Sequence, residues 1–261
     1  MQAVSEFRHV MHRCYIPPSA WLHQPLQPEA DEAHHLLHVL RARAGDLVTV
    51  FDGQGRHAEA RVRPLRDRAG RDAAQLDLVG APVAEQPRPP TLALLQAVLK
   101  GPRMDVVIEK AAELGVTTLV PLATARVVVR TDADSAGERR ARWERVALSA
   151  VKQCGTDWLP EIRPIVPLAQ ALAALPSDGL SVLGSLRADA PLLGEVLRRE
   201  AARARVSVTV IIGPEGDLTE DEQAACTAAG VHSVSFGPRV LRGETAALFA
   251  LSVIGHALEM G

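Results

Sequence analysis

The chain has 261 residues, of which 47% are hydrophobic, and its formal net charge is −2. This composition excludes a disordered chain, and the near-neutral charge excludes a general electrostatic attraction to polyanions such as nucleic acids. No apolar run is long enough for a signal peptide or a membrane span, so we expect a cytoplasmic protein without a membrane segment.

The N-terminal third of the chain carries the pattern of a small β-rich domain, which we place at residues 1–83. A short helix is expected first, over residues 29–40. Strands are then expected over 47–51, 56–63 and 75–79. The first two flank Asp52-Gly53-Gln54-Gly55, whose residues tolerate positive φ, and this arrangement predicts a β-hairpin.

Arginines are concentrated in this domain. Between residues 34 and 71 the chain has eight arginines and four acidic residues, a local excess of four positive charges. The arginines stand at positions 41, 43, 56, 61, 63, 66, 68 and 71. Such a cluster fits a surface that grips phosphates, but it also fits the solvated face of any small β domain, so it does not decide between the two.

Three prolines within residues 87–90 exclude both helix and central strand, so we predict a linker over 84–90. From residue 91 to 261, apolar runs alternate with helical periodicity, which predicts an α/β domain with a parallel sheet flanked by helices. The expected strands are 92–99, 117–121, 180–183, 206–212 and 231–236. The expected helices are 104–114, one opened by Ser135, 192–203, 220–229 and 244–258, and Thr219 with Glu222 predicts a capping box at the start of the fourth.

Ligands in open α/β sheets bind beyond the carboxyl ends of the strands, which directs attention to the loops after Leu183, Ile212 and Phe236. The second of these loops begins Gly213-Pro214-Glu215-Gly216, where the glycines allow close approach of a ligand and Pro214 stiffens the backbone. A simple tight turn would also explain the glycines. It explains less well a carboxylate held between them at a strand end.

The third loop, residues 236–243, contains a glycine and delivers Arg239 and Arg242 just before a helix. Backbone N–H groups at such a loop can read an adenine edge or a ribose. Arg239 is equally compatible with an ordinary surface residue. Neither G-x-G-x-x-G after the domain's first strand nor G-x-x-x-x-G-K-[ST] is present, which disfavours nicotinamide and nucleoside-triphosphate cofactors.

We expect no metal site and no disulfide. The three cysteines, Cys14, Cys154 and Cys226, are far apart and form no C-x-x-C pair. His34 and His38 have the four-residue spacing of helical zinc ligands, but no third ligand accompanies them.

The two glycine-bearing loops together resemble the RsmE family of SPOUT methyltransferases. The matching residues are Gly213-Pro214-Glu215-Gly216 in the first and Gly237-Pro238-Arg239-Val240-Leu241-Arg242, followed by Glu244-Thr245-Ala246, in the second. The resemblance spans nearly the whole chain. It also includes Lys100, Arg103, Lys110, Glu113-Leu114-Gly115-Val116, Gln153-Cys154-Gly155, Val39-Leu40-Arg41 and Gly45-Asp46. Three positions depart from the family pattern, because Asp217 stands in place of a usual Gly, Gly243 in place of Thr, and Thr156 in place of a common Arg.

The resemblance implies a PUA-like β-barrel domain that binds RNA, followed by a SPOUT domain with a C-terminal trefoil knot. It implies transfer of a methyl group from S-adenosylmethionine (SAM) to uridine N3 in 16S ribosomal RNA by a homodimer. Whether the substrate is free RNA or the assembled small subunit stays open, and the sequence itself cannot show dimerisation.

The resemblance and the loop positions yield a set of expected site residues. The cofactor-binding candidates are Leu183, Gly184, Gly213, Pro214, Glu215, Gly216, Phe236, Gly237, Val240, Leu241 and Arg242. The RNA-binding candidates are Arg41, Arg43, Arg56, Arg61, Arg63 and Arg126. For catalysis, we expect Arg242 to stabilise negative charge on the uracil as the N3 proton leaves. Glu215 or Glu244 accepts that proton or only fixes the loop, and the sequence does not choose between these roles.

Two rival interpretations remain. One is a related knotted methyltransferase that acts on a ribose 2′-oxygen or on transfer RNA, which the paired loop motifs disfavour. The other is a non-catalytic RNA-binding protein that kept this fold, which the departures at Asp217 and Gly243 make conceivable.

Overall fold

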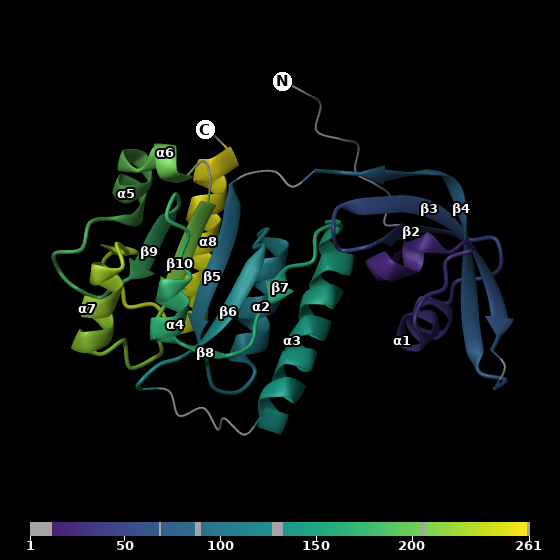
Figure 1. The fold of residues 1–261 in the computed structure, drawn as a ribbon, viewed down its shortest axis with the longest axis horizontal. Coiled ribbons are helices and arrows are strands. Elements are labelled where there is room, and N and C mark those ends of the chain that lie inside the picture. The colour runs from purple at the N-terminus through teal and green to yellow at the C-terminus, as the bar shows by residue number, and fades with distance from the viewer. Residues whose placement is uncertain (1–11, 68, 87–89, 127–132, 205–206, 260–261) are drawn as a thin grey trace. The chain divides into compact units, whose positions relative to one another are not determined.

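The computed structural model describes residues 12–67, 69–86, 90–126, 133–204 and 207–259. The chain divides into two compact units, one made of residues 1–87 and 151–159 and the other of residues 88–150 and 160–261 (Figure 1). The short segment 151–159 therefore groups with the N-terminal unit, although it follows the long helix α3 (Ala133–Cys154) and overlaps its last turn. The predicted boundaries, at residues 83 and 91, did not anticipate that residues 151–159 belong to the first unit.

The first unit is built on a four-stranded sheet in the order β1-β2-β3-β4. Its strands are β1 (Arg13–Tyr15), β2 (Leu47–Phe51), β3 (Arg56–Arg66) and β4 (Asp72–Ala84). The predicted hairpin between β2 and β3 is confirmed: Asp52 Oδ1 accepts hydrogen bonds from the backbone N–H groups of Gln54 at 2.7 Å and Arg56 at 3.0 Å. Among the described residues no ladder joins β4 back to β1, so the predicted barrel is seen as an open sheet.

Short helices accompany this sheet. The predicted helix over 29–40 is α1 (Ala30–His34), which continues as a π-helical turn, η2 (His35–Val39), and a 3₁₀ turn, η1 (Pro18–Leu22), precedes it. The core of the unit is apolar and fully buried, and includes Ile16, Leu26, Leu36, Val50 and Leu76.

The second unit contains a seven-stranded sheet in the order β11-β9-β10-β5-β6-β7, with β8 also paired to β6. Every pairing in this sheet is parallel, which confirms the predicted α/β class. Its strands are β5 (Thr91–Ala97), β6 (Thr118–Ala123), β7 (Glu161–Ile162), β8 (Val166–Pro167), β9 (Leu180–Gly184), β10 (Ser207–Ile212) and β11 (His232–Val234).

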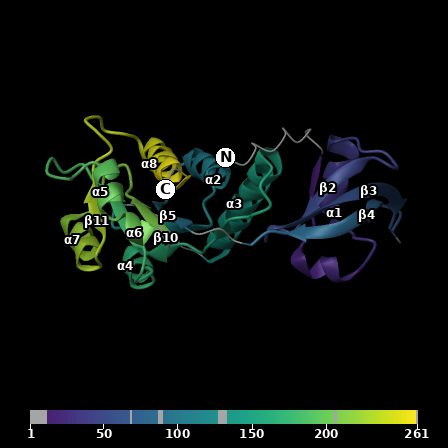
Figure 2. The same ribbon diagram turned by 90° about the horizontal axis from the view of Figure 1, so that it is seen from above.

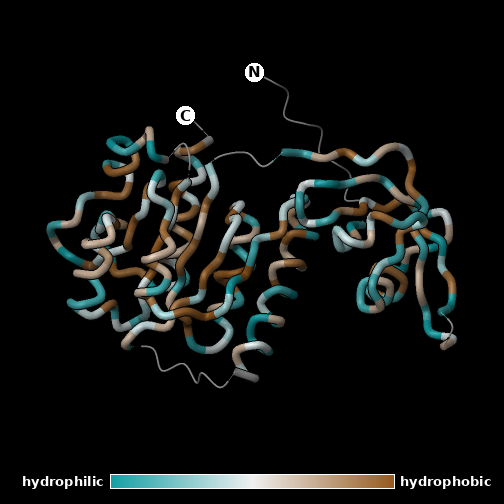
Figure 3. Tube along the Cα trace, in the orientation of Figure 1, coloured by the Kyte–Doolittle hydropathy of each residue, from teal (hydrophilic) through white to brown (hydrophobic). Residues whose placement is uncertain are grey.

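Helices cover both faces of this sheet. They are α2 (Arg103–Glu113), α4 (Leu168–Ala173), α5 (Leu193–Arg199), α6 (Ala201–Ala204), α7 (Glu220–Ala228) and α8 (Gly243–Glu259). Figure 2 shows α2 and α8 on one face and α4 on the other. The strands at the centre of the sheet are mostly apolar (Figure 3), because both of their faces are buried.

Alternation along the strands decides which side chains meet which helices. On the α4 face, Leu95, Leu122 and Ile211 pack against Leu168 and Leu172 in one buried cluster. The apolar stripe of α8 packs into the core of this unit, since Ala247, Leu251 and Ile254 are fully buried.

The helix boundaries agree with the sequence-based expectation at α7 and differ from it at α3, α5 and α6. The predicted capping box of α7 is present, with Thr219 and Glu222 bonded reciprocally. Helix α3 begins at Ala133, two residues before Ser135, and the single helix expected over 192–203 is split into α5 and α6. None of the helices in the described ranges combines the length and apolar character needed to cross a membrane.

Candidate functional site

Three loops meet at one edge of the large sheet. Strands β9, β10 and β11 are parallel, with β9 between the other two, so the chain leaves all three in the same direction. The loops after Gly184, Ile212 and Val234 line a cavity of about 750 Å³. This is the edge at which the glycine-bearing loops were expected to form a site.

Most predicted cofactor residues line this cavity. They are Gly184, Gly213, Pro214, Glu215, Phe236, Gly237, Val240, Leu241 and Arg242. Leu183 and Gly216 do not line it. The side chain of Leu183 is only 2% exposed and packs in the core cluster beneath α4, because successive residues of a strand face opposite sides.

The loops after β9 and β11 are packed together by a glycine. A Cβ atom at Gly184 would lie 2.7 Å from Cε2 of Phe236, so a side chain at this position would displace the aromatic ring. The Phe236 ring also packs against Phe249 of α8, with 5.6 Å between centroids. Gly184 therefore allows Phe236 to form a wall of the cavity.

The loop after β10 is braced on both sides. Arg103 Nη1 donates to Glu215 Oε1 at 2.8 Å, and Arg126, a predicted RNA-binding residue, donates from Nη1 to the Gly216 carbonyl. Asp217 lines the cavity with a left-handed backbone, φ +61°. Its Oδ1 accepts from the Leu218 N–H at 2.7 Å and its Oδ2 from Gln223 Nε2 at 3.3 Å.

The first loop, between β9 and α5, contributes residues that the sequence did not single out. Leu186, Arg187 and Leu192 all line the cavity. Arg187 donates two hydrogen bonds to Asp189, at 2.9 and 2.8 Å, and these bonds lower the pKa of the Asp189 carboxyl. The expectation that ligands bind beyond the carboxyl ends of strands pointed to this loop. Its residues match no known motif, so the sequence did not identify them individually.

The candidate catalytic groups are placed differently from one another. Arg242 lines the cavity, is exposed, and has no ion-pair partner among the residues that the structure describes. Glu215 also lines the cavity, whereas Glu244, in the first turn of α8, does not. Glu244 Oε2 is buried and has no hydrogen-bond partner in the described ranges. Of the two candidate carboxylates, the structure therefore places Glu215 at the cavity and Glu244 outside its lining.

The arginines of the first unit fall into two groups. Arg56 pairs with Asp52 at 3.3 Å and Arg63 with Asp77 at 2.9 Å. Arg61 donates to the Gly45 carbonyl at 3.3 Å. Arg41 and Arg43 are exposed, and neither side chain has a partner within the described part of the chain. Of the six RNA-binding candidates, Arg41 and Arg43 therefore have guanidinium groups without a partner in the described ranges, and these are available to an anionic ligand.

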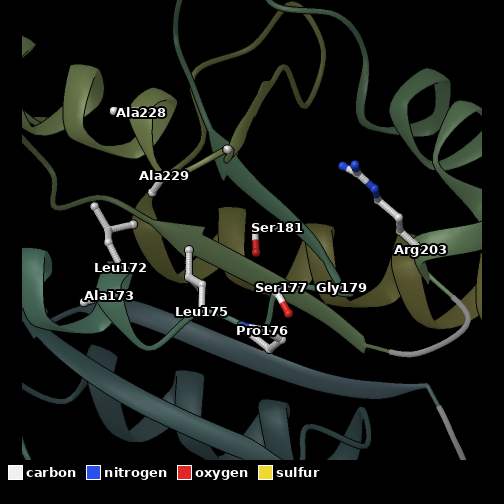
Figure 4. Close-up of a pocket in the computed structure, with 11 residues that line it drawn as sticks. Leu172, Ala173, Leu175, Pro176, Ser177, Gly179, Ser181, Arg203, Ala228 and Ala229 are labelled. Carbon is white, nitrogen blue, oxygen red and sulfur yellow. The ribbon is translucent and has the colours of Figure 1, made fainter.

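A second cavity, of about 640 Å³, lies at the opposite end of β9. Figure 4 shows Leu172 and Leu175 on one side of it, the Ser181 hydroxyl, and Arg203 reaching in from α6. The loops after Ile212 and Val234 do not contribute to it. We therefore assign the site to the first cavity.

Two models of known protein families match this chain. A model described as an RNA methyltransferase domain matches residues 86–255. A model described as an RNA methyltransferase PUA domain matches residues 28–68.

Similar proteins span nearly the same length. Ribosomal RNA small subunit methyltransferase E of Synechocystis sp. is 30% identical over 249 residues, which cover 95% of this chain and 78% of the relative. The protein of the same name from Bacillus subtilis is 26% identical over 88% of this chain and 89% of its own.

Two solved structures are also similar. One is a ribosomal RNA small subunit methyltransferase E from Neisseria gonorrhoeae bound to S-adenosyl methionine, with a TM-score of 0.80 and 31% identity, covering 94% of this chain and 97% of that one. The other is a methyltransferase from Legionella pneumophila in complex with SAM, with a TM-score of 0.81 and 30% identity over 95% and 98% of the chains.

Proposed function

This chain belongs to the RNA methyltransferase family that includes ribosomal RNA small subunit methyltransferase E, and from that membership we propose that it methylates 16S ribosomal RNA at uridine N3 with SAM as methyl donor. The observation that carries the proposal is the cavity at the carboxyl edge of β9, β10 and β11, lined by both glycine-bearing loops. We also propose a cytoplasmic location, because the proposed substrate is ribosomal RNA.

The cavity suits SAM in size and chemistry. Its volume of about 750 Å³ is within the usual range for small-molecule sites, roughly 300 to 1,000 Å³. Ile212, Val240 and Leu241 provide apolar walls, and the glycine loops bring backbone donors and acceptors close to an adenine and a ribose. Glu215 and Asp217 supply negative charge for a ligand with a sulfonium and an ammonium group, and Arg187 supplies positive charge for its carboxylate.

SAM supplies an activated methyl group on a good leaving group. The new bond joins uridine N3 to the methyl carbon, the sulfur–methyl bond breaks to leave a neutral sulfide, and the N3 proton must go to a base. We assign Arg242 to the uracil carbonyl oxygen that gains negative charge as that proton leaves. Because Glu215 lines the cavity and Glu244 does not, we assign the proton to Glu215 and a structural role at the start of α8 to Glu244.

We assign RNA binding to the N-terminal unit, with residues 1–83 as a PUA-like domain, 84–90 as the linker and 91–261 as the SPOUT domain. Arg41 and Arg43 support this assignment, because exposed and unpaired guanidinium groups are suited to phosphates. The trefoil knot of the SPOUT fold belongs to the same proposal.

We also propose that two copies assemble around the site. Leu186, Leu192 and Val240, which line the cavity, are 62%, 50% and 78% exposed, and the neighbouring Phe249 is 41% exposed. A concentration of exposed apolar side chains beside a site is typical of a surface covered by a partner. Light scattering on the purified protein tests the homodimer directly.

The experiment that tests the activity supplies isotope-labelled SAM and undermethylated small-subunit RNA, then identifies the methylated nucleoside by mass spectrometry. We expect 3-methyluridine. A 2′-O-methylated nucleoside, or methylation of transfer RNA alone, would favour the related knotted enzymes. Absence of any transfer, together with retained RNA binding, would favour the non-catalytic alternative.

A further inference from the structure

The ion pair between Arg103 and Glu215 joins the start of α2 to the loop after β10, across 112 positions of sequence. We propose that Arg103 is a positioning residue of the methyl-transfer site, which acts by holding the Glu215 carboxylate in a single orientation. This inference rests on the proposed function, and it adds a residue that none of the loop motifs contains.

Arg103 contacts the carboxylate and not the cavity. Its Nη1 lies 2.8 Å from Glu215 Oε1, and Glu215 lines the cavity whereas Arg103 does not. Within the described residues, Glu215 Oε2 has no hydrogen-bond partner. One oxygen is therefore held by the protein, and the other stays available to a ligand or to a proton.

The surroundings of both residues fix the pair. Arg103 is the first residue of α2, and it follows Gly101, whose φ of +64° sets the direction in which the helix starts. On the other side, Arg126 holds the Gly216 carbonyl, so the backbone beside Glu215 is already restrained. The contact with Arg103 then removes the rotational freedom that a half-exposed glutamate side chain would otherwise keep.

Folding stability does not explain this pair. Its side chains are 41% and 38% exposed, and ion pairs with such exposure contribute little to stability because solvent screens them. Replacing Arg103 should leave the protein folded. Its effect is expected in the site, where a misplaced catalytic group reduces the rate strongly.

Arg140 provides a matched control. It pairs with Glu144 at 2.8 Å, and the two side chains are 44% and 47% exposed, close to the values for Arg103 and Glu215. Both residues lie on α3, and neither lines the cavity.

The test measures kcat, the KM for RNA and the SAM dissociation constant for Arg103→Met, Arg103→Lys, Glu215→Gln, the double variant Arg103→Met/Glu215→Gln and the control Arg140→Met. We expect Arg103→Met to lower kcat roughly ten- to a hundredfold with an unchanged KM for RNA. Arg103→Lys should recover part of the loss. The double variant should be no slower than Glu215→Gln alone, because Arg103 acts only through that carboxylate.

Three results would overturn the proposal. Losses that multiply in the double variant, with a raised KM for RNA, would show that Arg103 contacts RNA directly. An Arg103→Met enzyme with wild-type kcat would show that the pair has no part in the reaction, and so would a Glu215→Gln enzyme with wild-type kcat. Failure of the proposed function itself is distinguishable, because the wild-type protein would then transfer no methyl group.

Discussion

Arg13 donates a hydrogen bond to the carboxylate of Asp157, although 144 positions separate the two residues in the chain. Their side chains are 8% and 7% exposed, and Asp157 Oδ2 also lies 2.7 Å from His57 Nδ1. A second pair, Lys152 with Glu32 at 2.6 Å, lies in the same unit, and its side chains are 14% and 12% exposed. These contacts join residues 151–159 to β1, β3 and α1 of the N-terminal unit.

Replacing Asp157 with Ala should strongly destabilise the N-terminal unit, because it leaves the buried charge of Arg13 without its carboxylate counter-ion. We expect a loss of about 3 to 5 kcal/mol in the free energy of unfolding, measured in urea. The control is Asp77→Ala, whose partner Arg63 is 55% exposed and which should cost at most about 1 kcal/mol. Equal losses in the two variants would contradict a role for burial.

Arg242→Ala should lower kcat by a factor of about 100 or more, since it removes the donor that faces the developing negative charge. SAM affinity, measured by calorimetry, should change little. Arg140→Ala, on α3 and outside the cavity, serves as the control and should stay near the wild-type rate. Equal losses of turnover and SAM affinity in Arg242→Ala would reassign Arg242 to cofactor binding.

Arg41→Ala and Arg43→Ala should each weaken RNA binding and reduce the slope of log affinity against log salt concentration by about 1, because each removes one phosphate contact. Fluorescence anisotropy across a potassium chloride series measures both quantities. Arg71 forms an ion pair with Asp67 at 2.8 Å, so Arg71→Ala should have a smaller effect on RNA affinity and on its salt dependence. The grouping of free and paired arginines would be wrong if all three variants behaved alike.

Asp217 combines a left-handed backbone with two side-chain hydrogen bonds. Asp217→Ala keeps the strain and loses both bonds, so it should cost about 1 to 3 kcal/mol in the free energy of unfolding. Asp217→Gly loses the same bonds but relieves roughly 1 kcal/mol of backbone strain, and should therefore be the more stable variant. Thermal unfolding of the two variants measures the contribution of backbone strain. A less stable Asp217→Gly than Asp217→Ala would contradict strain at this position.

The three cysteines should differ in reactivity. Cys154 is exposed, whereas Cys14 and Cys226 are buried. Burial raises the pKa of the Cys226 thiol to about 11 and also raises that of Cys14, so both stay protonated and unreactive at pH 8. A thiol reagent should label Cys154 alone in the native protein and all three after denaturation. Labelling of Cys226 should accelerate only as the pH approaches 11.

The expectation that ligands bind beyond the ends of parallel strands pointed to the edge where the cavity lies, because it depends on topology, which apolar runs reveal. The pairs that brace the loop could not be predicted, since Arg103 and Glu215 are brought together only by the order of strands in the sheet. The sequence also did not show that the Leu183 side chain packs in the core cluster and not in the cavity lining, because it does not indicate which layer each face of a strand meets.

Short elements were also missed. Strands β7 and β8 have two residues each, and α4 has six, too few for a periodic pattern to appear. The hairpin, the α7 capping box and the long apolar strands were predicted correctly, because each depends on neighbouring residues.

The N-terminal unit is made of two separate segments of the chain, residues 1–87 and residues 151–159. During synthesis, Arg13 and Glu32 therefore leave the ribosome long before Asp157 and Lys152 exist to neutralise them. The unit can complete its polar interior only after most of the chain has been translated. A fragment cut at the linker would likewise lack this segment, so the RNA-binding role is better examined by point substitution in the intact protein.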